Sequence, residues 1–166
     1  AIGIGGSYLG PKMAVEALAP FHQGPDIHFV SNIDPSHLDD LLAGLNPVTT
    51  AVIAISKTFT TTETLMNLTA AEAWFEKGGV PSKGRVIAVT SRPDVAQDRG
   101  IDASLVLPMD EGVGGRFSLW SAVGLPIMVV VGAEMFTAMI AGASQMDDHF
   151  THADCAENLP VMAGMI

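Results

Sequence analysis

Ala51-Val52-Ile53-Ala54-Ile55-Ser56-Lys57-Thr58-Phe59-Thr60-Thr61-Thr62-Glu63-Thr64 is the most informative stretch of this chain. An apolar run is followed by a segment rich in serine and threonine, and then by a helical pattern over residues 62–76. That order predicts a buried strand, a turn and the N-terminus of a helix. Helix N-termini attract phosphate through unpaired N–H groups and a positive dipole end, and hydroxyls can donate to the same oxygens. On its own, the segment fits a threonine-rich helix cap equally well.

Short apolar runs alternate with helical patterns on both sides of this stretch. Strands are predicted at 1–4, 27–30, 51–55, 86–89 and 104–107. Helices are predicted between them at 9–18, 37–45, 62–76 and 95–99, and further helices at 119–131, 136–150 and 160–166. Such alternation forms right-handed βαβ units. The sequence therefore predicts an α/β fold, with a five-stranded parallel sheet flanked by helices and extra helices at the C-terminal end.

Two helix starts carry capping signals. Asp34 precedes a proline, which is typical of an N-cap followed by proline at the first helical position. Ser91 and Asp94 have the spacing of a capping box. No repeat, low-complexity segment or linker divides the chain, so residues 1–166 are expected to form one domain. A strand pattern at residue 1 and a helical pattern at residue 166 indicate a piece of a longer protein.

Composition excludes several classes of function. The 166 residues are 48% hydrophobic and carry a net charge of −10 without a basic cluster, which disfavours nucleic-acid binding. Residues 117–133 lack a formal charge, but this segment contains glycine and proline and falls short of the ~20 apolar residues that a membrane span needs. The lone Cys155 excludes an internal disulfide and is typical of a reducing compartment. The histidines lack metal-ligand spacing, so no metal is expected.

A glycine-rich turn, Gly3-Ile4-Gly5-Gly6-Ser7-Tyr8-Leu9-Gly10-Pro11-Lys12, lies between the first strand and the first helix. Its backbone amides could approach an anion closely. The third glycine of a dinucleotide fingerprint would fall at Tyr8, and Pro11 stands where a Walker A lysine would be. NAD and ATP are therefore poorly supported. The alternative is a turn that only allows tight packing of strand and helix.

A second glycine segment, Gly112-Val113-Gly114-Gly115-Arg116-Phe117, holds a lone arginine beside the long uncharged segment. Its planar cation could face charge that develops on a substrate oxygen. The alternative is a structural ion pair with Asp110 or Glu111. Two interpretations also remain open for Lys57. Its side chain either contacts the phosphate or is only solvated at the end of a strand.

Together these segments resemble the glucose-6-phosphate isomerase family. Residues 3–11 and 56–64 are similar to its two phosphate loops, and residues 114–124 to its signature segment. Segments 30–34, 146–150 and 158–161 follow in the family's order. The resemblance implies a three-layer sugar-isomerase (SIS) domain of a cytoplasmic, homodimeric enzyme without cofactor. That enzyme interconverts glucose 6-phosphate and fructose 6-phosphate by ring opening and proton transfer through an enediol.

The resemblance also implies a set of site residues. Arg116 would stabilise the enediolate. The residues implied at the phosphate and sugar are Gly5, Gly6, Ser7, Ser56, Lys57, Thr58 and Thr61. Tyr8 departs from the aspartate of many members. The family's general-base glutamate, ring-opening histidine and C-terminal lysine lie beyond residue 166, so this fragment is expected to be inactive alone.

Two other functions compete with the isomerase. One is a non-catalytic SIS module that senses sugar phosphates in a regulator, and the other is a purely structural α/β domain. Arg116 argues against the sensor, because a sensor has no enediolate to stabilise.

Overall fold

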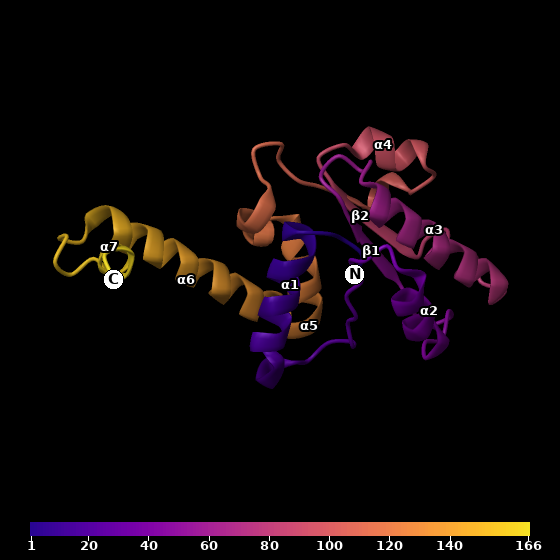
Figure 1. Ribbon diagram of the computed structural model, residues 1–166, viewed down its shortest axis with the longest axis horizontal. Helices are drawn as coiled ribbons and strands as arrows, with labels where there is room; N and C mark the ends of the chain where they lie inside the picture. The colour runs from indigo at the N-terminus through magenta and orange to yellow at the C-terminus, as the bar shows by residue number, and fades with distance from the viewer.

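A parallel sheet forms the centre of the computed structural model, which describes residues 1–166 (Figure 1). Its three strands lie in the order β1 (Val52–Ile55), β2 (Val86–Thr90) and β3 (Val106–Pro108). Val52 lies opposite Val86, and Ala88 lies opposite Val106. Every residue of β1 is buried, as expected of a strand that is covered on both faces.

Two further segments join the sheet at single residues. Ile2 forms parallel bridges to both Val30 and Ala54, which gives the spatial order Val30, Ile2, β1. The α/β prediction is confirmed, but the prediction of five strands is wrong, because these two segments are not strands. The chain leaves the ladder at Gly5, where a φ of +59° turns it into the first helix. Of residues 27–30, only Val30 forms a bridge: its N–H donates to Ala1 O at 2.9 Å, and its carbonyl accepts the Gly3 N–H at 3.1 Å.

Four α-helices follow in the positions that the sequence predicts, with ends shifted by a few residues. They are α1 (Gly6–Ala17), α2 (Pro35–Ala43), α3 (Thr62–Lys77) and α4 (Pro93–Asp98). Short 3₁₀ turns lie at η1 (Ala19–Phe21) and η2 (Ala103–Leu105). The predicted cap of α2 is confirmed, because the Asp34 carboxylate accepts the Ser36 N–H at 3.0 Å.

The capping box predicted at α4 is wrong. The N-cap is Arg92, and no side chain caps the helix. Asp94 pairs with the Arg92 guanidinium at 2.6 Å instead. The Ser91 hydroxyl donates to the Lys57 carbonyl at 2.7 Å, across to the loop that follows β1.

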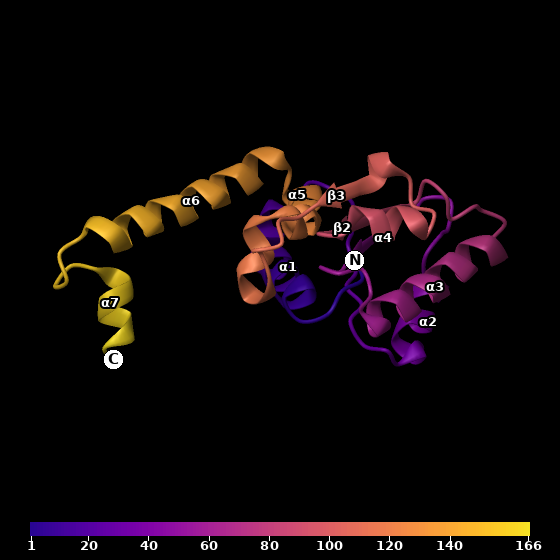
Figure 2. The ribbon, with the colours of Figure 1, turned by 90° about the horizontal axis from the view of Figure 1, so that it is seen from above.

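The sheet is covered on both faces, because successive side chains of a strand point to opposite sides. On one face, Val52 and Ala54 join a core built with α2, α3 and α4, which includes Leu68 and Phe75. On the other face, Ile53 and Ile55 pack against Val123 and the start of α5 (Leu125–Val131). Helix α1 packs on α5 in turn. Figure 2 shows α2 and α3 on one side of the sheet and α1 with α5 on the other.

The single helix predicted at 119–131 is wrong, because the chain breaks there into three pieces. These are η3 (Gly115–Trp120), η4 (Ala122–Gly124) and α5. Ser121 has extended backbone, with φ −102° and ψ −165°, and its hydroxyl donates to Ser118 O at 2.6 Å. Pro126 lacks the N–H that a continuous helix would use. The last piece, α5, is buried at Ile127, Val130 and Val131.

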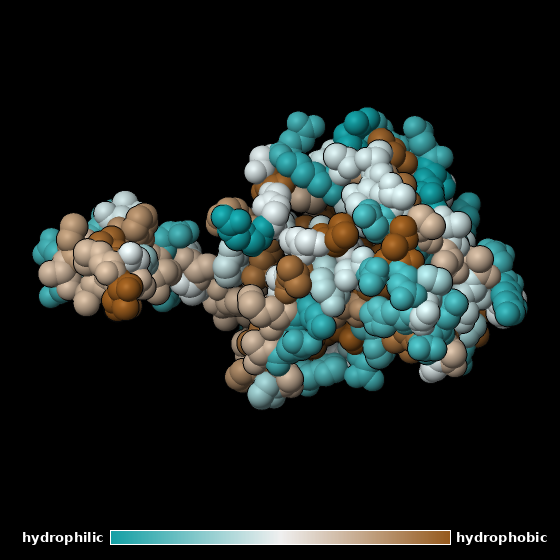
Figure 3. Space-filling model, viewed as in Figure 1, coloured by the Kyte–Doolittle hydropathy of each residue, from teal (hydrophilic) through white to brown (hydrophobic).

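The C-terminal helices form an arm that projects from the rest of the molecule (Figures 1 and 2). It consists of α6 (Ala133–His152), none of whose residues is buried, and α7 (Leu159–Gly164). Both agree with the predicted helices. Asn158 joins them, because its side chain donates to Phe150 O at 2.8 Å and accepts the Val161 N–H at 3.2 Å. Apolar residues colour much of the arm in Figure 3. No helix has both the length and the apolar character needed to cross a membrane.

Candidate functional site

Three loops meet beyond the carboxyl end of β1. We call them the glycine loop (residues 3–7), the hydroxyl loop (residues 56–61) and the arginine loop (residues 112–117). A β-carbon on Gly3 would lie 3.2 Å from Ile55 O, so the glycine loop lies directly against the end of β1. A β-carbon on Gly114 would lie 3.5 Å from Lys57 Nζ, which joins the arginine loop to the hydroxyl loop. The structure therefore brings together all three segments that the sequence singles out.

The glycine and arginine loops touch at their backbones. A β-carbon on Gly6 would collide with the carbonyl oxygen of Gly115. Gly115 itself has a φ of +56°, in the left-handed region that favours glycine. Glycine is thus required in both loops, because their backbones approach each other closely. This contact fixes the backbone position of the next residue, Arg116.

The hydroxyl loop is organised by its own side chains. The hydroxyls of Ser56 and Thr61 share a hydrogen bond of 2.9 Å, and those of Thr58 and Thr60 share one of 2.7 Å. Phe59 turns the loop with a φ of +53°, which is uncommon outside glycine. Its side chain is only 1% exposed and belongs to the main core. The loop is therefore anchored from below by a buried ring.

Two helices begin at this end of the sheet without a side-chain cap. Thr61 is the N-cap of α3, but its hydroxyl pairs with Ser56 instead of a helix amide. Gly5 is the N-cap of α1 and has no side chain to offer. The Ser7 hydroxyl, in the first turn of α1, makes no hydrogen bond. Thr64, in the first turn of α3, has a buried hydroxyl without a partner. Uncapped amides at a helix start are free to donate hydrogen bonds to an anion.

The two cations of the site make no ion pair. The three ion pairs of the chain involve Lys12, Arg92 and Arg99. Arg116 is exposed and its guanidinium carbon lies 4.8 Å from the centre of the Phe117 ring. The alternative of an ion pair between Arg116 and Asp110 or Glu111 is therefore wrong for this structure. The Asp110 carboxylate accepts the Gly112 N–H at 2.7 Å instead.

Sequence reasoning missed two residues at the end of β2. Thr90, which is fully buried, donates its hydroxyl to Lys57 O at 2.9 Å. Ser91 donates both its N–H and its hydroxyl to the same oxygen, at 2.9 and 2.7 Å. The signal in the sequence was two consecutive hydroxyl residues directly after the strand predicted at 86–89. The capping-box spacing of Ser91 favoured a helix cap instead.

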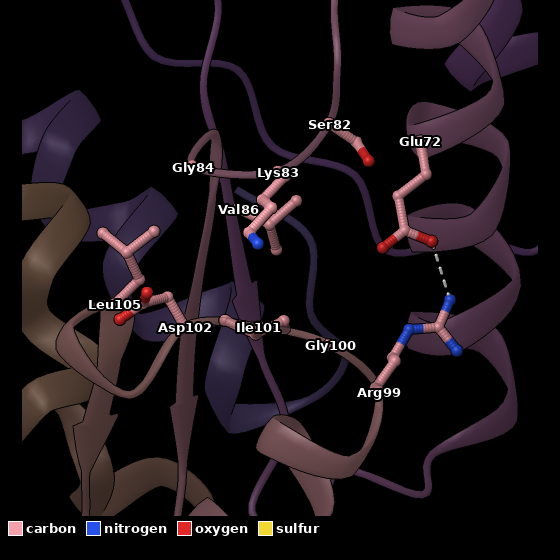
Figure 4. A pocket seen from close by; sticks show the side chains of 10 residues that line it. All are labelled: Glu72, Ser82, Lys83, Gly84, Val86, Arg99, Gly100, Ile101, Asp102 and Leu105. Carbon is pink, nitrogen blue, oxygen red and sulfur yellow. Dashed lines mark hydrogen bonds and ion pairs between the residues drawn. The ribbon is translucent and has the colours of Figure 1, made fainter.

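Two cavities lie outside the three loops. A cleft of about 140 Å³ lies near the start of β2, where Arg99 and Glu72 form an ion pair of 2.9 Å (Figure 4). A larger, mostly apolar cavity of about 610 Å³ lies between α2 and the sheet, with Leu38 and Leu42 in its wall. Neither cavity is lined by a residue of the predicted site. No group of three or more His, Cys, Asp or Glu side chains comes together in a way that could hold a metal ion.

Fold and site together define an α/β protein in which three loops meet beyond the carboxyl end of a parallel strand. These loops hold two uncapped helix starts, a cluster of hydroxyls and two cations without an ion pair. The chain belongs to the phosphoglucose isomerase family, whose family model matches residues 1–166.

Individual relatives agree with this assignment. The chain is 48% identical over 165 residues to a glucose-6-phosphate isomerase of Cereibacter sphaeroides and 51% identical over 167 residues to that of Chelativorans sp. strain BNC1. Each alignment covers 99% of this chain and 31% of the relative. Among solved structures, a glucose-6-phosphate isomerase from Chlamydia trachomatis aligns with a TM-score of 0.88 at 33% identity, over 99% of this chain and 32% of that one. A hypothetical protein from Thermus thermophilus aligns with a TM-score of 0.82 at 32% identity, over 99% and 39% of the chains.

Proposed function

We propose that residues 1–166 form one SIS-type phosphosugar-binding domain of a glucose-6-phosphate isomerase. The parent enzyme interconverts glucose 6-phosphate and fructose 6-phosphate and acts as a cytoplasmic homodimer. The observation that carries the proposal is the meeting of the glycine, hydroxyl and arginine loops beyond the end of β1. The family membership and the names of the relatives support the same activity.

The phosphate binds at the two uncapped helix starts in this proposal. Amides of Gly5 and Gly6 and the free hydroxyl of Ser7 come from the start of α1. The hydroxyl loop supplies the second group of contacts, from Ser56, Lys57, Thr58 and Thr61. Hydrogen bonds to a charged group contribute roughly 1.5–3 kcal/mol each, so a few of them suffice for specific binding of a sugar phosphate.

Arg116 acts on the sugar end of the substrate. Moving a proton between C1 and C2 places negative charge on an enediolate oxygen, and a positioned cation stabilises such charge most in the transition state. Three features support this role: Arg116 is exposed, it makes no ion pair, and its backbone is held by the contact of Gly6 with Gly115. The reaction also needs a general base, and neither Glu63 nor Glu111 occupies the position of the family's base. The isolated chain therefore binds substrate without converting it.

The names of the relatives favour this enzyme over a sugar-phosphate sensor in a regulator. Titration of the 166-residue chain with fructose 6-phosphate, followed by amide NMR, tests binding. We expect the largest shifts at residues 5–7 and 56–61, and a spectrum without shifts there would overturn the proposal. A coupled isomerase assay on the same sample should show no turnover. Activity that survives purification to homogeneity would contradict the missing base.

A further inference from the structure

We infer that Thr90 and Ser91 are positioning residues for sugar-phosphate binding, which they serve by fixing the direction of the Lys57 peptide group. This inference rests on the proposed function, because it concerns the same site. Neither residue belongs to the three loops. Both act from the end of β2, 33 and 34 residues further along the chain than Lys57.

The Lys57 carbonyl oxygen accepts three hydrogen bonds from these two residues. The donors are the Thr90 hydroxyl at 2.9 Å, the Ser91 hydroxyl at 2.7 Å and the Ser91 N–H at 2.9 Å. A carbonyl oxygen has two lone pairs, so three donors saturate it. The Lys57 carbonyl therefore points toward the end of β2. Its partial negative charge would repel a phosphate, and in this direction it is bound by the three donors.

The direction of this carbonyl also decides the direction of the next amide. The peptide group is planar and trans, so the Thr58 N–H points opposite to the Lys57 C=O. The Thr58 N–H makes no hydrogen bond, although the preceding Ser56 N–H donates to Val89 O at 3.0 Å. Thr90 and Ser91 thus turn an unused amide of the hydroxyl loop away from the sheet, where it can donate to an anion.

The two hydroxyls differ in what else they hold. The Thr90 side chain is fully buried, and its oxygen also accepts the Arg92 N–H at 3.0 Å. Removing the Thr90 hydroxyl leaves the Arg92 N–H without this partner and leaves a space in the buried side chain's place, which lowers stability as well. The Ser91 hydroxyl lies nearer the surface and donates only to Lys57 O. Ser91→Ala therefore separates the positioning effect from the stability of the fold.

The test measures binding of inorganic phosphate and of fructose 6-phosphate to the 166-residue chain. We expect Ser91→Ala to weaken both about 3-fold and Thr90→Val about 10-fold, in line with the loss of one or two hydrogen bonds. Thr90→Ser should restore wild-type affinity, because it returns the hydroxyl. The matched control Ser104→Ala removes a hydroxyl bonded to Asp102 and should change neither affinity. The Thr58 amide resonance provides a readout that stability alone would not move, since it should shift with phosphate in the wild type and less in Ser91→Ala.

Two results would contradict the inference, and they are distinguishable. A wild type that binds, together with variants that bind equally and show the same Thr58 shift, overturns the inference alone. A wild type that binds neither ligand overturns the proposed function, and the inference with it. Where Thr90→Val does not fold, the result for Ser91→Ala decides.

Discussion

The backbone of Gly6 lies so close to Gly115 that no side chain fits between them. This contact joins the first turn of α1 to the loop that carries Arg116, although more than a hundred residues separate the two glycines in the sequence. The phosphate end and the sugar end of the proposed site are therefore held to each other by main chain. Main chain is stiffer than a pair of side chains, which have rotamers to choose from.

Gly6→Ala should displace the arginine loop, because the new methyl group collides with the Gly115 carbonyl. We expect a loss of about 1–3 kcal/mol in the free energy of unfolding, in the range of overpacked sites. Urea denaturation measures this loss. Gly142→Ala is the matched control, since nothing lies within 4 Å of its β-carbon on α6. That control should be neutral or stabilising by roughly 0.5–1 kcal/mol. Equal midpoints for Gly6→Ala and the wild type would contradict the contact.

Thr61→Val should weaken binding of fructose 6-phosphate while the fold stays intact. The change removes one hydroxyl and keeps the shape of the side chain, so the expected cost is roughly 1.5–3 kcal/mol of binding free energy. Isothermal titration calorimetry measures the affinity, and circular dichroism checks the fold. Thr137→Val on α6 removes a hydroxyl bonded only to Ala133 O and should leave the affinity unchanged. Unchanged affinity in Thr61→Val as well would remove Thr61 from the site.

Phe59→Ala should lower both stability and affinity, because the buried ring anchors the hydroxyl loop. Truncating a buried phenylalanine costs about 3–5 kcal/mol of unfolding free energy. Phe75→Ala is the matched control, as Phe75 is equally buried in the same core but lies near the far end of α3. Both variants should unfold at lower urea, and only Phe59→Ala should bind phosphate more weakly under folding conditions. Similar affinities in the two variants would show that Phe59 only fills the core.

Asp34 should make part of the stability depend on pH. Its pKa lies below the ordinary value of 3.8, because its carboxylate accepts the Ser36 N–H at the start of α2. A lowered pKa means that the stabilisation is complete above the unfolded pKa and is lost as the pH falls through the folded one. Asp34→Asn keeps a capping side chain without a titrating group. The midpoint temperature of thermal unfolding should therefore fall less steeply between pH 7 and pH 2 in Asp34→Asn than in the wild type. Parallel plots of midpoint temperature against pH for the two proteins would contradict the cap.

Features that depend on near neighbours could be predicted from the sequence. The α/β alternation, the start of α3 at Thr62 and the Asp34 cap were all predicted, because each follows from residues a few positions apart. The three motifs of the site were also recognisable in the sequence. Their glycines, hydroxyls and cations are chemically distinctive residues in compact runs.

Features that depend on distant partners emerge only in the folded chain. Ile2 and Val30 form bridges rather than strands, since a strand needs several consecutive hydrogen-bonded neighbours. Ser91 fits a local capping box, yet its hydroxyl reaches the Lys57 carbonyl across the ends of two strands. Hydrogen bonds and close contacts depend on distances in space, and residues such as Gly6 and Gly115 acquire their distance only when the chain is folded.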